Sequence, residues 1–254
     1  MNEEERIAAN NAQLASPSYR LAVNDPDFLL GDSMRGVRFQ MEYAKPEEAL
    51  RAWGVRSTIV VFGSARVAEG HDWYEGARVF GRLASEQGGA IRNTPGQPRD
   101  NVIATGGGPG IMEAANRGAY EAGAPSVGFT ISLPFEDVPN PFSTPELTFQ
   151  FHYFAMRKMH LAMRANALVV FPGGFGTLDE MFEILTLRQT GKAPNVPVVL
   201  YDEAYWRSVI NFESLAKYGM ISERDMNAFA FANTPQEAWE KLLENGLKPH
   251  ESID

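Results

Sequence analysis

Short apolar runs alternate along the chain with longer segments in which apolar residues recur at helical spacing. Most of the runs are continuously apolar, which is typical of strands that are covered on both faces, as in parallel sheets. Glycine-rich turns and helical segments follow several of them, and this repeated order predicts an α/β fold with a doubly wound, mostly parallel sheet and helices on both faces. The predicted strands are residues 58–62, 102–105, 127–132, 147–153, 167–171, 196–201 and 229–232.

Helical periodicity is clear after residue 56 and weak before it. Residues 1–55 are polar and interrupted by prolines and glycines, with short helical segments only at 2–14 and 46–53. We expect an N-terminal extension, residues 1–55, packed on a single domain formed by residues 56–254. The stretches 88–101 and 133–145 are expected to be loops. The predicted helices are residues 72–87, 111–120, 154–164, 177–190, 204–218 and 235–245.

The functional prediction depends on the turn that follows the strand at 167–171. Gly173, Gly174 and Gly176 permit close approaches that a side chain would obstruct, so backbone N–H groups can converge on an anion. A helix is predicted from Thr177 onward. Its N-terminus would lie at the carboxyl end of a buried strand, where open α/β sheets bind phosphorylated ligands.

The same turn also has a purely structural explanation. Thr177 and Glu180 have the spacing of a capping box, in which each side chain satisfies a backbone donor of the other, and the glycines would then form only a tight turn. A second loop of the same kind, Gly106-Gly-Gly-Pro-Gly110, favours ligand binding. Both loops would face one crevice, where one takes a phosphate and the other a sugar or base. For the second loop, tight strand-to-helix packing is the alternative.

Composition narrows the classes of function. The chain has 23 basic and 32 acidic residues and a net charge of −9, which argues against an extended surface for nucleic acid or anionic membranes. It has no cysteine, which excludes disulfides, thiolate nucleophiles and cysteine-ligated metals. The start is acidic without an apolar core, and no apolar run has membrane-spanning length, so we expect a cytoplasmic protein without nucleic-acid or membrane partners.

Several familiar chemistries do not fit the motifs. Neither glycine loop matches Gly-x-Gly-x-x-Gly, because Ile111 and Asp179 stand where the last glycine would be, and no Walker A lysine follows either loop. The four histidines lack His-Glu-x-x-His spacing, so we expect no metal. Ser64 is not in a nucleophile elbow, since Phe62 and Arg66 occupy the glycine positions; a hydrogen-bonding role at the strand end suits it better.

The remaining groups suit a nucleoside monophosphate. The phosphate would rest on the N–H groups of 174–177, while Glu180 reaches the ribose hydroxyls or a water beside the anomeric carbon. Hydrolysis of an N-glycosidic bond passes through an oxocarbenium-like state, which a carboxylate stabilises. Arg157 is a plausible partner near the start of the helix at 154–164, although with Arg164 it could belong to a solvated face. Only one carboxylate is evident, so the sequence identifies no group that protonates the leaving base.

Three motifs together resemble those of one family. Residues Pro172-Gly-Gly-Phe-Gly-Thr-Leu-Asp-Glu180 match the Pro-Gly-Gly-x-Gly-Thr-x-x-Glu motif of the LOG ("Lonely guy") family, the cytokinin riboside 5′-monophosphate phosphoribohydrolases. The segment 106–119 looks like the family's other hallmark, and Met156-Arg157-Lys158 matches its Arg-Lys pair. The resemblance covers roughly residues 56–245.

The resemblance implies a Rossmann-like homodimer that releases a free base and ribose 5-phosphate without a cofactor, with Arg157 and Glu180 as catalytic residues. A homodimer is also indicated by the helix at 154–164, which carries more apolar residues than one buried face needs. Members have often been labelled lysine decarboxylases, although we recognise no pyridoxal phosphate site here. The expected substrate-binding residues are Ser64, Gly107, Gly108, Gly110, Glu113, Lys158, Gly173, Gly174, Gly176 and Thr177.

The chain departs from the shortest family members in three places. It adds the first 55 residues and the loop at 88–101, and it has Glu113 where those members have glycine. Substrate preference therefore stays open between AMP and a cytokinin riboside 5′-monophosphate, and we expect AMP because the sequence does not reveal room for a prenyl group. The alternative function is a non-catalytic nucleotide-binding module of the DprA or molybdenum-cofactor-carrier type. The presence of both Arg157 and Glu180 favours the enzyme.

Overall fold

The computed structural model describes residues 1–91, 97–132, 138–193 and 195–248, which form two compact units. Met1–Lys45 is the first and Pro46–Asp254 the second. The boundary lies inside a helix, α3 (Arg35–Ala52), which continues through Gly36 and Pro46, where the sequence predicted breaks. That prediction was wrong because the helix tolerates both residues.

The first unit consists of short helical pieces. No residue of 1–45 is buried, and none of these pieces has a core of its own. Our expectation that residues 1–55 pack on the core stays a prediction. The pieces that precede α3 are α1 (Glu3–Ala15), η1 (Pro17–Tyr19), η2 (Ala22–Asn24), α2 (Pro26–Leu30) and η3 (Asp32–Met34).

The second unit is built on one parallel sheet. Its described strands are ordered β4-β3-β2-β1-β5-β6-β7, and every neighbouring pair is parallel. The doubly wound fold is confirmed, as are all the predicted strands to within two residues at each end. The strands are β1 (Thr58–Phe62), β2 (Val102–Thr105), β3 (Ser126–Ile131), β4 (Thr148–Phe151), β5 (Ala165–Val170), β6 (Val198–Tyr201) and β7 (Ala230–Ala232).

The strand order places a switch point beside β1. Strands β1 to β4 follow one another outward on one side, and the chain then returns to place β5 on the other side of β1. Pairing continues past the strand ends, because Phe171 N donates to Phe62 O at 2.8 Å and Ser64 N donates to Pro172 O at 2.9 Å. The loops after β1, β2 and β5 therefore converge where open α/β sheets bind their ligands.

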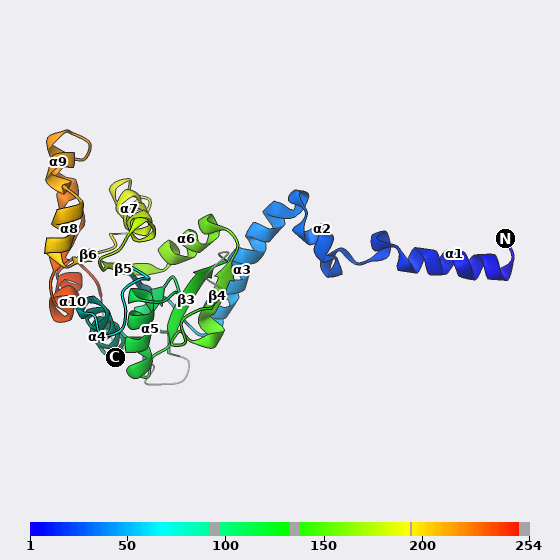
Figure 1. The fold of residues 1–254 in the computed structure, drawn as a ribbon, viewed down its shortest axis with the longest axis horizontal. Coiled ribbons are helices and arrows are strands. Elements are labelled where there is room, and N and C mark those ends of the chain that lie inside the picture. Colours follow the sequence, from blue (N-terminus) through cyan, green and yellow to red (C-terminus); the bar gives the residue numbers. More distant parts are fainter. Residues whose placement is uncertain (92–96, 133–137, 194, 249–254) are drawn as a thin grey trace. The chain divides into compact units, whose positions relative to one another are not determined.

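Helices cover both faces of this sheet (Figure 1). Side chains of β1 alternate between two buried clusters, with Ile59 and Val61 in one and Val60 and Phe62 in the other. The first cluster is completed by α4 (Asp72–Gln87), α5 (Ile111–Glu121) and α10 (Pro235–Glu244). The second is completed by the end of α3 and by α6 (Phe154–Met163), α7 (Phe175–Gln189), α8 (Glu203–Val209) and α9 (Phe212–Lys217).

The segment predicted as one helix at 204–218 is two helices. Ile210 is extended, and Asn211 caps α9 by accepting a hydrogen bond from Ser214 N at 2.9 Å. An asparagine that satisfies a helix N-terminus competes with a continuous helix, and the periodicity did not reveal it. Short 3-10 segments, η4 (Pro145–Leu147) and η5 (Glu223–Ala228), complete the described elements.

Two of the predicted loops are described only in part. Residues 92–96 of the stretch 88–101 and residues 133–137 of the stretch 133–145 lie outside the described residues. Across the described ranges, no helix combines the length and the apolar character needed to cross a bilayer.

Candidate active site

Three loops meet at the carboxyl ends of β1, β2 and β5, and Ser64 joins them. Its N–H donates to Pro172 O, and its carbonyl accepts from Ile111 N at 3.2 Å. Gly110 has a φ of +70°, and a Cβ there would lie 2.4 Å from the Ser64 carbonyl oxygen, so only glycine fits. The Ser64 hydroxyl accepts from Arg66 N at 3.1 Å, which agrees with the hydrogen-bonding role that the sequence favoured.

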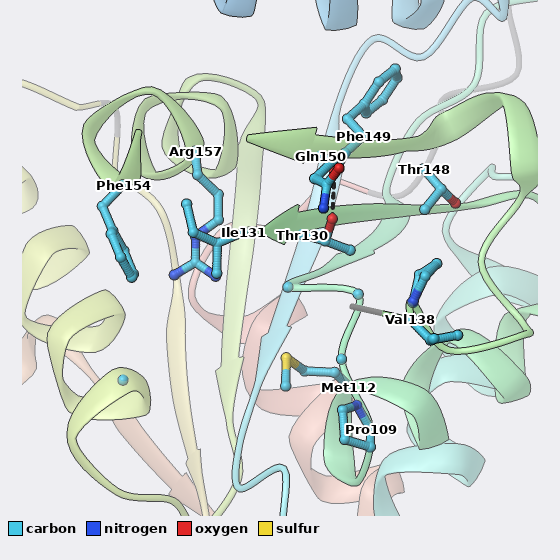
Figure 2. A pocket seen from close by; sticks show the side chains of 15 residues that line it. Pro109, Met112, Thr130, Ile131, Val138, Thr148, Phe149, Gln150, Phe154 and Arg157 are labelled. Atoms are coloured by element: carbon cyan, nitrogen blue, oxygen red, sulfur yellow. Dashed lines mark hydrogen bonds between the residues drawn. The ribbon is translucent and has the colours of Figure 1, made fainter. Parts of the chain in front are cut away.

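The first cavity at this edge has a volume of about 420 Å³ and mostly apolar walls. Figure 2 shows Arg157 and Phe154 extending from α6 on one side and Met112 and Pro109 on the opposite side, at the start of α5. The cavity is lined by Gly106, Gly107, Gly108, Pro109, Met112, Thr130, Ile131, Val138, Pro139, Thr148, Phe149, Gln150, Phe154, Arg157 and Gly176.

The second cavity, of about 630 Å³, lies along the loop that follows β5. It shares Met112, Arg157 and Gly176 with the first cavity, so the two form one site with two compartments. It is lined by Phe62, Gly63, Ser64, Ala65, Arg66, Met112, Arg157, Gly173, Gly174, Phe175, Gly176, Thr177, Leu178, Tyr205 and Val209.

The N-terminus of α7 opens into the second cavity. The helix begins at Phe175 with Gly174 as its N-cap and without a side-chain cap, so Thr177 is the third helical residue and Glu180 the sixth. The predicted capping box is therefore wrong, because the glycine loop winds into the helix two residues earlier than expected. The N–H groups of Phe175, Gly176 and Thr177 precede the first intrahelical donor, Leu178 N, and are left for water or an anion.

Arg157 stands where the two compartments meet. Its Nη2 donates to Glu180 Oε1 at 3.0 Å, and its Cζ lies 5.3 Å from the centre of the Phe154 ring. A Cβ built on Gly106 would lie 3.6 Å from Nη1, so the guanidinium also lies against the first glycine loop. Its side chain is 11% exposed, and within the described part of the chain its buried Nε has no hydrogen-bond partner. The site therefore holds a cation with an unused donor.

Glu180 lies behind Arg157 rather than in the open cavities. It is 4% exposed and lines neither compartment, only a small recess that it shares with Lys158 and Phe62. Burial raises the pKa of the Glu180 carboxyl to about 7, although the positive charges of Arg157 and Lys158 oppose the rise. A carboxyl that titrates near neutral pH suits proton transfer or charge stabilisation at an active site.

The other candidate residues divide into two groups. Gly107, Gly108, Ser64, Gly173, Gly174, Gly176 and Thr177 line the two compartments. Gly110, Glu113 and Lys158 line neither. Glu113 accepts a hydrogen bond from the buried Tyr74 hydroxyl at 2.9 Å, and Lys158 pairs with Asp179 at 2.9 Å and Glu183 at 3.1 Å. Substrate contacts of all these residues stay predictions.

Sequence reasoning missed Asn140, which fixes the first glycine loop. Its N–H donates to Gly107 O at 2.8 Å, and its side-chain amide donates to Gly108 O at 3.1 Å and to Asn116 Oδ1 at 3.0 Å. Gly107 N is also used within the protein, since it donates to Thr105 Oγ1 at 2.9 Å. Asn140 gave no signal in sequence because these partners, two backbone carbonyls and the Asn116 side chain, are distant in the chain.

In the parts of the chain that the structure describes, no three His, Asp or Glu side chains lie close enough together to hold a metal ion. The expectation that the protein uses no metal stays a prediction.

A family model described as "Possible lysine decarboxylase" matches residues 112–242, which is more than half of the chain. The chain belongs to this family, the LOG family. The match begins at the second residue of α5 and includes Arg157 and the whole of α7, whereas the loops after β1 and β2 precede it.

Curated relatives carry LOG names at low identity. A probable cytokinin riboside 5′-monophosphate phosphoribohydrolase LOGL3 of Oryza sativa subsp. japonica is 26% identical over 152 residues, which cover 57% of this chain and 68% of the relative. The cytokinin riboside 5′-monophosphate phosphoribohydrolase LOG1 of Arabidopsis thaliana is 25% identical over 156 residues, which cover 60% of this chain and 71% of the relative. For rice LOGL6, the chain covers only 57% of the relative's length.

Solved structures share the fold of this LOG-family chain. The structural-genomics target TM1055 aligns with a TM-score of 0.52 and 20% identity over 74% of this chain and 99% of its own. A Moco carrier protein from Chlamydomonas reinhardtii aligns with a TM-score of 0.50 and 22% identity over 75% of this chain and 97% of its own. These likenesses concern the fold alone.

Proposed function

We propose that this LOG-family protein hydrolyses the N-glycosidic bond of a nucleoside 5′-monophosphate, with AMP as the expected substrate. Water oxygen bonds to the anomeric carbon, the carbon–nitrogen bond breaks with its electron pair on the base, and the base takes up a proton. The products are the free base and ribose 5-phosphate. The observation that carries the proposal is the buried Arg157–Glu180 pair, set between two glycine loops at the switch point of the sheet.

The two compartments suit the two ends of such a substrate. The free N–H groups at the start of α7 give the second cavity the character of a phosphate site. The first cavity has apolar walls formed by Met112, Ile131, Phe149 and Phe154, which suit a base. Arg157, which lines both, would then lie beside the ribose.

Arg157 and Glu180 share the catalytic work in this proposal. The ionised carboxylate stabilises the positive charge that develops on the ribose, and the guanidinium orients the nucleotide. In the structure Glu180 is paired with Arg157 and lines neither cavity, so the pair must separate around a bound nucleotide before Glu180 can reach the ribose. The raised pKa of Glu180 places the change from the neutral to the ionised form close to pH 7.

A homodimer is part of the proposal. Phe154 and Met163 on α6 are 52% and 46% exposed, and Phe175 and Phe182 on α7 are also exposed, so neighbouring helices leave apolar surface uncovered. Apolar surface of this kind commonly marks a contact between protein chains. A second copy of this chain is the occupant we propose.

The alternative is a nucleotide-binding module without catalysis. One observation favours it: Glu180 is enclosed and paired, and lines neither cavity. Incubation with AMP followed by chromatography separates the two functions, because the enzyme releases adenine and the module returns AMP unchanged.

A further inference from the structure

Tyr205 lies behind the loop that follows β5, and neither the motifs nor the family match point to its role. Its hydroxyl donates to Gly173 O at 2.8 Å, and the residue is among those that line the second cavity. Since the described residues contain no cis peptide, the Gly173 carbonyl and the Gly174 N–H point in opposite directions in one peptide plane. A hydrogen bond that fixes the carbonyl therefore also fixes the Gly174 N–H, which points away from the Tyr205 hydroxyl.

Among the described residues, the Gly173 carbonyl accepts its hydrogen bond from Tyr205, while Leu178 N holds the next carbonyl, that of Gly174. Gly173 and Gly174 are adjacent glycines, which permit either orientation of the plane between them. A Cβ on Gly174 would meet nothing within 4 Å, so the space on that side of the residue is open. Thr177 packs on Gly173, since a Cβ there would lie 2.1 Å from Thr177 Oγ1. This contact limits the position of the Gly173 Cα, whereas the hydrogen bond from Tyr205 fixes the direction of the Gly173 carbonyl.

Tyr205 is itself held by a fixed frame. Asp202 caps α8 by accepting from Tyr205 N at 3.0 Å, and its second carboxylate oxygen accepts from Trp73 Nε1 at 2.8 Å. Asp202 has a φ of +71°, which costs energy for a residue with a side chain and persists only when its surroundings impose it. The Trp73 and Tyr205 rings also meet edge to face, with centres 5.5 Å apart. Helix α4 is thereby connected to the glycine loop.

We propose that Tyr205 is a positioning residue for phosphate: it ties back the Gly173 carbonyl and so aims the Gly174 N–H into the second cavity. The assignment rests on the proposed function, which places a nucleoside monophosphate in the site. The phosphate part of the site should then depend on Tyr205, and the nucleoside part should not. The ligand class it serves is a phosphate monoester dianion on a ribose.

The test compares Tyr205→Phe with wild type by calorimetry, using ribose 5-phosphate and adenosine as probes of the two parts. We expect the affinity for ribose 5-phosphate to fall about threefold to tenfold, the range that one net hydrogen bond supplies, and that for adenosine to stay within about twofold. The KM for AMP should rise by the same factor while kcat changes less than about twofold. Tyr120→Phe is the matched control, because the Tyr120 hydroxyl is exposed and donates to no described residue.

Equal losses for both probes would show a general structural role, and unchanged affinity for ribose 5-phosphate would show no role, so either result overturns the assignment. If Tyr205→Phe lowers the melting temperature strongly, Trp73→Phe replaces it as the test, since this change removes the Nε1 donor to Asp202 and should cause the same selective loss. A wild-type protein that binds neither probe would overturn the proposed function and this assignment together. If wild type binds the probes and Tyr205→Phe binds them with the same affinity, only the assignment of Tyr205 is overturned.

Discussion

Replacing Glu180 by glutamine should remove the loss of stability that burial of this carboxyl causes as the pH rises. The Glu180 carboxyl has a pKa of about 7 in the folded protein against 4.5 for an ordinary glutamate, so the folded state holds the extra proton between these values. Its contribution is therefore fully present below pH 4.5 and is lost as the pH rises through 7. The difference corresponds to at most about 3 kcal/mol of unfolding free energy. Glutamine cannot ionise and avoids this loss.

The assay is urea denaturation of wild type and Glu180→Gln at pH 5, 6, 7 and 8. We expect the variant to gain stability relative to wild type across this range, by up to about 3 kcal/mol. Glu240→Gln is the control, because it removes an exposed carboxylate from another helix, and it should show no such gain. If plots of unfolding free energy against pH are parallel for wild type and Glu180→Gln, the reasoning that burial raises the pKa of this carboxyl is refuted.

The same pair of proteins tests catalysis. If the ionised carboxylate stabilises the ribosyl cation, turnover of AMP by wild type should rise with an apparent pKa near 7, and glutamine should lower turnover by about 10²–10³ without that pH dependence. Affinity for AMP should change far less, because the phosphate supplies most of it. Since the structure contains no capping box here, a folded Glu180→Gln with wild-type turnover would leave Glu180 as the structural partner of Arg157 only.

Three further predictions follow from the site. Arg157→Ala should lower turnover by about 10², measured as adenine release. It should also lower the melting temperature, because Glu180 loses the positive charge that partly offsets its burial. Arg82→Ala, which removes an exposed arginine, is the control. Gly174→Val should fold normally, since a Cβ there meets nothing within 4 Å, yet weaken AMP binding at least about tenfold by filling the second cavity; unchanged affinity would contradict the phosphate site. Sedimentation at micromolar concentration should show a dimer that Phe182→Asp dissociates, whereas a 28.1 kDa species alone would exclude the proposed contact through α6 and α7.

The sheet was predictable because each of its strands leaves a signal in a few consecutive residues. The run 58–62 is apolar after Thr58, and the structure buries all five residues in the centre of the sheet. Glycine loops after two such runs indicated a common crevice, but we expected them on neighbouring strands, whereas β1 lies between β2 and β5. Boundaries that depend on one polar side chain were not predictable, as at Asn211, where a cap divides the expected helix in two.

The site was predictable where a motif carries it and not where tertiary contacts do. Arg157 and Glu180 came from family motifs, and the structure brings them within 3.0 Å. The burial that sets the pKa of Glu180 arises from neighbours on other elements, and so does the tether from Tyr205 to Gly173. The capping box failed for a related reason: its spacing was correct, but the backbone turns into α7 two residues before it.

The most direct test of the central claim is whether this protein cleaves AMP. Purified wild type and Arg157→Ala are incubated with AMP at pH 7.5, and the products are separated by chromatography. The account predicts equal amounts of adenine and ribose 5-phosphate from wild type and about a hundredfold less from the variant. AMP that binds to wild type and is recovered intact would contradict the account and establish the protein as a nucleotide-binding module.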